Sequence, residues 1–342
     1  MVNDDCKNNS QRINEKDPRR DPSAERAEDR RSCILKLTGL LQIKPMTSTK
    51  IRSLISRRRR VVVGSHTMND VATVVVARHG ERLDYQMRDA GENWTASAER
   101  PWDPPLTSHG QKQAQLLGRH LHKVLLQMQA PKISKVYASP FLRCRQTAAG
   151  VVRGRDSMRR SEASLGYYSV EPGLAESLNE SWYRSWALPG ADGTWGYKVD
   201  GKPEYDPATL HPAASKPVQD LLSIPEDDPM RKDTPPHTNI TIPYTFEPRN
   251  LESRADQRHR MKETLDTLAE TGSTIVLVSH GGPVTHLYEE LTGNPWQRHG
   301  ESSYCCYSIY QREEGQWTAL RVNQAEYLNE KIQYERHVSS DD

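Results

Sequence analysis

Arginine and histidine side chains gather where three apolar runs of this sequence end. The stretch VVVARHGER (residues 74–82) passes from a run of valines directly into an imidazole between two arginines. A second run, 135–138, is followed by SPFLRCRQTA (139–148), and a third, 274–278, is followed by SHGG (279–282). Arginine binds phosphate oxygens through two parallel hydrogen bonds. Because cations collected in one place repel each other without an anion, these segments predict an anion-binding site.

A sheet must bring these segments together. Residues 71–77 form a β-branched run, which is typical of a strand buried on both faces of a parallel sheet. The alternation of strands and helices predicts an α/β fold, with a largely parallel central sheet and helices on both faces. In such a sheet, ligands bind at the carboxyl ends of the strands. The predicted strands are 71–77, 135–138, 167–170 and 274–278, with a closing hairpin of 304–311 and 316–322. The predicted helices are one capped by Thr107 and those at 141–152, 253–270 and 284–291.

Residues 177–250 interrupt this alternation. The segment is rich in proline and glycine, shows little periodicity, and contains several tryptophans and tyrosines. A stretch of this length without regular elements is uncommon in a compact domain unless it forms a functional lid or a disordered insert. Because Trp and Tyr bring large apolar area that favours burial, we expect a long irregular insert rather than disorder. Its aromatic residues, with Trp182 and Trp186 foremost, either line the site or only fasten the insert to the domain.

The 342 residues are enough for one large α/β domain with extensions. Residues 1–60 hold sixteen basic and eight acidic residues, so the formal net charge of +2 averages a basic segment with an acidic remainder. We therefore predict a disordered basic N-terminal arm (1–67), a domain at 68–330 and a C-terminal tail (331–342). The alternative for the arm is a weak contact with a polyanion, such as nucleic acid or an anionic membrane.

Several features bear on the cellular compartment. Nothing approaches the roughly 20 consecutive apolar residues of a membrane span, and the acidic opening MVNDDCKNNS does not look like a secretory signal. The five cysteines, odd in number and without metal-ligand spacing, suit a reducing compartment, so we expect a cytoplasmic protein. The alternative is organelle import from an internal start at Met46, because MTSTKIRSLISRRRR is arginine-rich and acid-free. The oligomeric state is left open.

Four motifs occur here in combination: RHG after a strand, LTSHGQKQA (106–114), SPFLRCRQTA and a late SHGG. With them the chain, over roughly residues 70–325, resembles the histidine phosphatase (phosphoglycerate mutase-like) superfamily. Within it, RHGERLD, DPPLT (103–107) and VEPGL (170–174) are most similar to the phosphatase domain of the Sts, or ubiquitin-associated and SH3 domain-containing, proteins. The first 70 residues are too polar to hold either of those named modules.

The resemblance implies a phosphomonoester hydrolase that uses no metal and no cofactor. It makes His79 the nucleophile that forms a phosphohistidine, and a neutral imidazole with an ordinary pKa of about 6.5 is competent for this. It makes His280 a further donor to the phosphate. It implies Glu176 as the general acid that protonates the leaving oxygen, with Glu171 as the competitor. The residues implied to hold the phosphate oxygens are Arg78, Arg82 and Arg143.

Other functions remain alternatives. Within the same fold these are a phosphoglycerate mutase and a sugar-phosphate phosphatase, and outside enzymes a non-catalytic phosphate-binding scaffold. Mutases of this superfamily typically continue RHGE with Ser-x-Trp-Asn, whereas this chain continues with Arg82-Leu83-Asp84-Tyr85. A scaffold usually lacks at least one member of the set, and here the set is complete. If the aromatic residues of the insert line the leaving-group side, aryl or bulky esters such as phosphotyrosine are favoured.

Charged residues outside the motifs are expected to be structural or solvated. The arginines expected on the solvent face of the helix after SPFL are Arg145, Arg153 and Arg155. Since no HxxxH or carboxylate pairing supports a zinc site, the remaining histidines are expected to be surface or core polar groups. They include His109, His120, His122 and His286.

Overall fold

The computed structural model describes residues 71–158, 163–195, 208–225, 228–232 and 251–329. All of them belong to one compact unit, Ser65–Asp342, and the second unit is Met1–Gly64. The predicted basic arm (1–67) and C-terminal tail (331–342) therefore lie outside the described residues, as do large parts of the insert. Within the described ranges, every helix is too short or too polar to cross a bilayer.

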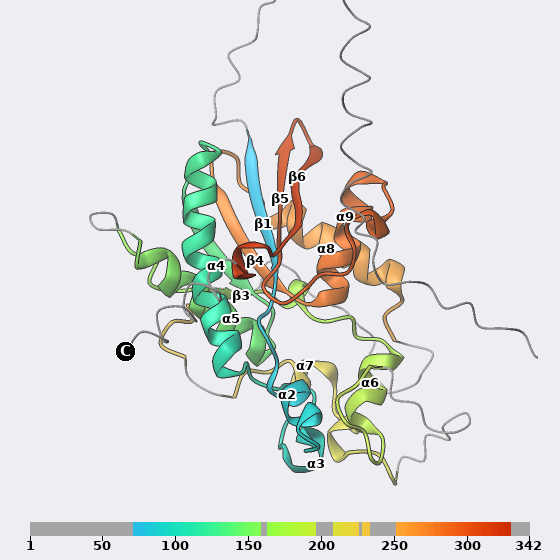
Figure 1. Cartoon of the computed structure of the whole chain (residues 1–342). Coiled ribbons are helices and arrows are strands. Elements are labelled where there is room, and N and C mark those ends of the chain that lie inside the picture. The colour runs from blue at the N-terminus through green and yellow to red at the C-terminus, as the bar shows by residue number, and fades with distance from the viewer. Residues whose placement is uncertain (1–70, 159–162, 196–207, 226–227, 233–250, 330–342) are drawn as a thin grey trace, which may run out of the picture. The chain divides into compact units, whose positions relative to one another are not determined.

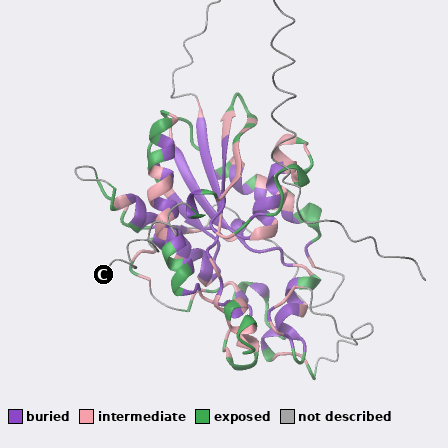
Figure 2. Cartoon of the chain, in the orientation of Figure 1, coloured by how far each residue is buried: buried purple, intermediate pink, exposed green. Residues whose placement is uncertain are grey.

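Six strands of the described residues form one mixed sheet in the order β3-β2-β4-β1-β5-β6 (Figure 1). They are β1 (Ala72–Arg78), β2 (Ile133–Ala138), β3 (Ser169–Val170), β4 (Thr274–Ser279), β5 (Tyr307–Glu313) and β6 (Gln316–Gln324). The strands β1 to β4 are parallel to one another, while β5 runs antiparallel to β1 and pairs with β6 as a hairpin. The predicted α/β fold with a largely parallel sheet is confirmed. Its central strands β1 and β4 are almost wholly buried, as their β-branched composition predicts (Figure 2).

Helices cover both faces of this sheet (Figure 1). On one face lie α4 (Ser108–Gln127) and α5 (Leu142–Asp156), and on the other lie α8 (Arg254–Leu268) and α9 (Gly281–Thr292). Alternate residues of a strand point to opposite faces, so Val75 joins the core under α4 and α5, whereas Val74 joins the core under α8 and α9. As predicted, Thr107 caps α4, and its side chain accepts a hydrogen bond from the backbone of Gly110. Ser253 caps α8 in the same way.

Helices α4 and α5 lie unusually close together because glycines line their contact. A Cβ atom on Gly118 would lie 2.2 Å from the Val151 carbonyl oxygen, and one on Gly154 would lie 2.1 Å from the Gln115 carbonyl oxygen. Neither distance is tolerable for a real side chain, so only glycine permits this approach. The close packing buries α5 between α4 and the sheet.

This burial makes the expectation for two arginines of α5 wrong. Arg145 and Arg155 are 1% and 4% exposed, and Arg153 alone is exposed as predicted. The Nε atom of Arg145 donates to the Pro140 carbonyl at 3.0 Å, and Arg155 forms an ion pair with Asp156 at 2.7 Å. A buried guanidinium is tolerated only with such acceptors, which the sequence spacing does not reveal.

A third apolar cluster lies among helical segments outside the predicted set, and α6 (Glu180–Ala187), η3 (Pro212–Ser215) and α7 (Val218–Leu221) contribute residues to it. The other such segments are the helices α2 (Leu83–Asp89) and α3 (Trp94–Ser97) and the 3-10 turns η2 (Pro172–Leu174) and η4 (Trp296–His299). The insert is thus less irregular than expected, since α6 begins at an Asn179 cap whose side chain accepts a hydrogen bond from the Trp182 backbone. Trp182 and Trp186 are each 2% exposed and pack in this cluster with Trp102 and Phe141.

Candidate active site

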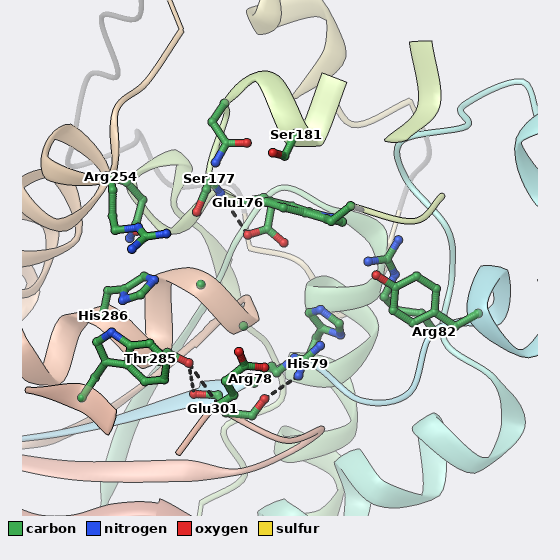
Figure 3. A pocket seen from close by; sticks show the side chains of 18 residues that line it. Arg78, His79, Arg82, Glu176, Ser177, Ser181, Arg254, Thr285, His286 and Glu301 are labelled. Atoms are coloured by element: carbon green, nitrogen blue, oxygen red, sulfur yellow. Dashed lines mark hydrogen bonds between the residues drawn. The ribbon is translucent and has the colours of Figure 1, made fainter. Parts of the chain in front are cut away.

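The carboxyl ends of β1, β2 and β4 meet at one edge of the sheet, as predicted. Arg78 is in register with Ser279, and Ala138 is in register with Val278. The backbone N–H of His79 donates to the Ser279 carbonyl at 3.0 Å. A cavity of about 390 Å³ opens at this edge, and Figure 3 shows Arg78, His79 and other charged side chains around it. The strand pairing, rather than proximity in sequence, therefore assembles the site.

His79 lies in the wall of this cavity, and its side chain is oriented by its own loop. Its Nδ1 atom is 2.7 Å from the carbonyl oxygen of Gly80. Because a carbonyl only accepts hydrogen bonds, Nδ1 carries the proton, which leaves the lone pair of Nε2 for an electrophile. Burial, and then the positive charges of Arg143, Arg78 and Arg82, lower the pKa of His79 well below its ordinary value of 6.5. The imidazole is therefore neutral at neutral pH.

The glycines of the RHG and LTSHG motifs let this loop touch the start of α4. A Cβ atom on Gly80 would lie 2.7 Å from the Gly110 carbonyl oxygen, and one on Gly110 would lie 2.4 Å from the Glu81 carbonyl oxygen. The hydroxyl of Thr107 donates to the Glu81 carboxylate at 2.7 Å, which closes the same contact. The two motifs thus form one clamp that fixes the backbone on which the His79 ring sits.

Arg78 and Arg82 line the cavity and are held in different ways. The guanidinium of Arg78 lies 4.5 Å from the centre of the Tyr304 ring and donates to the Ser302 carbonyl. Its Nε atom is buried without a hydrogen-bond partner in the described part of the chain. Arg82 instead makes a two-pronged ion pair with Asp84, with 2.9 Å from its Nε atom to the carboxylate. Both cations are preorganised before an anion binds.

Glu176 lies in the cavity wall and is 4% exposed. One carboxyl oxygen accepts the Ser177 backbone N–H at 3.0 Å. The other is 3.6 Å from Nη2 of Arg143 and 3.3 Å from Nδ1 of His280. Burial raises the pKa of the Glu176 carboxyl, although the charge of Arg143 opposes this. The carboxyl group consequently keeps its proton to a higher pH than an exposed glutamate, as a general acid requires.

An arginine that the sequence analysis did not single out holds the segment carrying Glu176. Arg260 of α8 donates to the carbonyls of Gly173 at 2.7 Å, Ala175 at 3.1 Å and Glu176 at 3.1 Å. Its charge is balanced by Glu252, whose carboxylate is 2.7 Å from Nε. Nothing in the sequence distinguishes Arg260 from the other charged residues of α8, because its three acceptors come from a distant loop.

Glu171, the competing candidate for the acid, has a structural position. Its side chain is fully buried and accepts the Gly173 backbone N–H at 3.0 Å, which caps the turn η2. It is not among the residues that line the cavity. Of the two candidates, Glu176 therefore lines the cavity and Glu171 does not, and the acid role of Glu176 stays a prediction.

Arg143 and His280 lie behind the cavity wall rather than in it. They are 1% and 0% exposed, and both reach the carboxyl group of Glu176. The Nε2 atom of His280 is 2.8 Å from the hydroxyl oxygen of Ser139, and its ring centre is 5.4 Å from that of His79. Burial, and then the charges of Arg143 and His79, lower the pKa of His280 well below its ordinary value. A direct contact of either residue with a phosphate stays a prediction.

The remaining walls of the cavity come from residues that the sequence analysis did not place there. Polar side chains of α8 and α9 line one side, and they are Arg254, Gln257 and His286. Three aromatic rings line other parts of the wall, and they belong to Tyr85, Trp195 and Trp296. Trp182 and Trp186 are absent from the lining, so these two aromatic residues fasten the insert to the domain. Among the described residues, no group of three or more His, Cys, Asp or Glu side chains is arranged to hold a metal ion.

The sequence model of the family described as the histidine phosphatase superfamily (branch 1) matches residues 74–180 and 226–325. The chain therefore belongs to this superfamily. This membership identifies it as a phosphatase. No curated protein sequence matches the chain.

Several solved structures are similar to this chain. A mycobacterial glucosyl-3-phosphoglycerate phosphatase is 17% identical with a TM-score of 0.43, and the match covers 75% of this chain and 100% of that chain. The ecdysone phosphate phosphatase of Bombyx mori, in complex with tungstate, is 20% identical over 74% and 93%, with a TM-score of 0.41. A phosphoglycerate mutase of Bacillus anthracis is 17% identical over 77% and 98%, with a TM-score of 0.42. The closer similarity to the Sts-type domain stays a prediction.

Proposed function

We propose that this protein is a phosphomonoester hydrolase that works without a metal ion, through a phosphohistidine on His79. The observation that carries the proposal is the contact of Nδ1 with the Gly80 carbonyl, which places the lone pair on Nε2 of a ring that lines one cavity with Arg78 and Arg82. The lowered pKa of His79 favours the neutral ring. In phosphoryl transfer, positioning and charge stabilisation supply nearly all of the catalysis. The arginines therefore hold the phosphate oxygens while the imidazole approaches phosphorus in line with the leaving oxygen.

The reaction has two steps with balanced proton movements. In the first, the lone pair of Nε2 forms the N–P bond, the ester P–O bond breaks, and Glu176 gives its proton to the departing oxygen. In the second, water attacks the phosphohistidine, Glu176 takes a proton from that water, and the N–P bond breaks to release phosphate. The raised pKa of Glu176 supports the first of these roles. Arg143 and His280 hold the carboxyl group in position for both steps.

We further propose a preference for aryl or bulky phosphate esters of the phosphotyrosine type. Three aromatic side chains, Tyr85, Trp195 and Trp296, line the cavity, and they offer rigid apolar faces to a flat leaving group. The volume of about 390 Å³ accommodates a small aryl ester. We expect kcat/KM for phenyl phosphate to exceed that for 3-phosphoglycerate or fructose 1,6-bisphosphate by about tenfold, which is about 1.4 kcal/mol.

The test of this function is phosphate release from p-nitrophenyl phosphate in EDTA by the wild type, His79→Ala and, as a control, His109→Asn. His109 is exposed at the start of α4, so its variant is expected to keep full activity. His79→Ala is expected to be inactive, and acid-labile, base-stable phosphate should be trapped on His79 of the wild type. Labelled phosphate on a Ser, Asp or Cys residue would overturn the mechanism. Transfer of phosphate between phosphoglycerates without comparable hydrolysis would identify a mutase. Absence of any turnover, with phosphate binding retained, would identify a non-catalytic scaffold.

The N-terminal arm is a separate proposal. We expect it to make a weak electrostatic contact with polyanions in the cytoplasm and to leave the catalytic constants untouched. Deleting residues 1–67 should therefore abolish any salt-sensitive retention on a polyanion column while kcat and KM for small esters stay unchanged. Retention that is independent of the deletion would show that the arm is not the contact.

A further inference from the structure

One wall of the cavity, formed by the first turns of α8 and α9, has no part in the proposed reaction. Arg254, Gln257 and His286 line this wall. Figure 3 shows Arg254 and His286 together on one side of the cavity, across from Arg82. This wall lines the same cavity as Arg78 and Arg82, so it lies within the space open to an ester whose phosphate those arginines hold. The wall is therefore placed to contact the part of a substrate that differs from one ester to another.

Gln257 is the least satisfied residue of this wall. It is 1% exposed, and both its amide nitrogen and its amide oxygen lack a hydrogen-bond partner in the described part of the chain. Leaving a buried polar atom unpaired costs about 1–3 kcal/mol. Such a group needs an explanation, and a ligand in the cavity that Gln257 lines provides one.

The charges of the wall are also unbalanced. Arg254 makes no ion pair among the described residues, whereas Arg258, one turn later, lies 3.5 Å from Glu289 and 3.8 Å from Glu290. The Nδ1 atom of His286 is buried without a partner in the same described ranges. Burial, and then the charges of Arg254 and Arg258, lower the pKa of His286, while the carboxylates of Glu289 and Glu301 oppose this shift. Besides Glu176, Glu301 is an acidic residue that lines the cavity.

We propose that Arg254, Gln257 and His286 form a specificity subsite that binds a carboxylate on the leaving group of the substrate, an inference that rests on the proposed hydrolase function. Arg254 supplies the charge, the Gln257 amide N–H and the His286 ring N–H donate hydrogen bonds, and the Gln257 oxygen accepts from water. A carboxylate suits the wall better than a second phosphate, because Glu301 repels a dianion more strongly than a single charge.

The test compares aryl phosphates that differ only in one group. We use 4-phosphonooxy derivatives of benzoate, phenylacetate and phenylpropanoate, each beside its neutral primary amide. For at least one length, the wild type is expected to prefer the carboxylate over the amide about tenfold in kcat/KM. In Arg254→Gln this ratio should fall to near one, and in Arg254→Glu it should invert. The control Arg258→Gln, whose arginine is already ion-paired, is expected to keep the wild-type ratio.

Gln257→Leu provides a second measurement that does not depend on Arg254. Removing the unpaired amide atoms should raise the thermal stability of the free protein and lower the carboxylate preference together, whereas a purely structural glutamine would lose stability. A ratio near one at all three lengths in the wild type, or an unchanged ratio in Arg254→Gln, overturns the subsite. If phenyl phosphate is not hydrolysed at all, the proposed function fails, and calorimetric binding of the three ester pairs to His79→Ala then decides the subsite alone.

Discussion

Replacing Glu176 with glutamine isolates its proton-donating role. Glutamine has the shape of the protonated carboxyl group and carries the same zero charge, and its amide oxygen can still accept the Ser177 backbone N–H. The amide nitrogen then faces Arg143 and His280, where it can donate to an unprotonated ring nitrogen but cannot accept from Arg143. The transferable proton is lost, together with the 3.6 Å contact to Arg143. The defect in kcat should therefore depend on how much the leaving oxygen needs a proton, rather than on how tightly the phosphate is bound.

The magnitude follows from the strength of general acid catalysis, which contributes about 10²- to 10⁴-fold. For an alkyl phosphate, whose leaving alkoxide is strongly basic, we expect Glu176→Gln to reduce kcat about 100- to 1000-fold, which is about 2.7–4.1 kcal/mol. For p-nitrophenyl phosphate, whose leaving phenolate is stable without a proton, we expect a loss of about threefold or less in the phosphorylation step.

The assay is a series of phosphate monoesters with leaving groups of graded basicity, measured by phosphate release and by single-turnover formation of phosphoenzyme. In the wild type the rate of phosphorylation should depend weakly on leaving-group basicity, and in Glu176→Gln the dependence should become steep. The matched control is Glu171→Gln, whose amide oxygen can still accept the Gly173 N–H that caps η2, so this variant should keep the shallow dependence. An equal loss for alkyl and nitrophenyl esters would refute the acid role of Glu176.

The pH dependence of phosphorylation tests the same role of Glu176. His79 must be unprotonated to attack, and its lowered pKa extends activity toward acid pH. Glu176 must be protonated to act as the acid, so phosphorylation slows as pH rises through its raised pKa. Glu176→Gln should abolish this fall at the alkaline side and leave the rise at the acid side in place.

Three further predictions concern stabilisation of the transition state, the aromatic residues and the buried histidines. Arg143→Ala should lower kcat/KM by about 3 kcal/mol, the cost of losing a preorganised charge, and a variant within about threefold of wild type would remove Arg143 from the site. Trp182→Ala should cost about 3–5 kcal/mol of unfolding free energy with the aryl preference kept, whereas Trp195→Ala should weaken that preference with little loss of stability; the opposite pairing would contradict the cavity lining. Because folding lowers the pKa values of His79 and His280, unfolding free energy should fall as pH drops below about 6.5, by up to about 1.4 kcal/mol per pH unit for each histidine. Urea unfolding at graded pH measures this slope, and His79→Ala should make it shallower.

The sheet and its two helical layers were predictable because their signals are local. The β-branched run of β1 predicts a strand buried on both faces, and Thr107 predicts the start of α4. The predicted solvent exposure of Arg145 and Arg155 was wrong, because both are buried. Their burial follows from the close contact of α4 with α5, which depends on glycines in two different helices. Helix α6 was missed, although Asn179 followed by Glu180 is a local cap signal, because its aromatic positions lie in a segment without wider periodicity.

By itself, the sequence determined the superfamily and which side chains end up at the carboxyl edge of the sheet, because motif residues sit directly after strands. The RHG motif after a strand, in which His79 lies between Arg78 and Gly80, is enough to single out His79 as the candidate nucleophile. Only the tertiary structure separated Glu176 from Glu171, which lie five positions apart: Glu176 lines the cavity, whereas the buried side chain of Glu171 caps η2. It alone also brought Arg254 and His286 to the same wall, since α8 and α9 pack side by side on one face of the sheet. Burial and the distances between charges set the chemistry of such residues, and both depend on contacts between segments far apart in the chain.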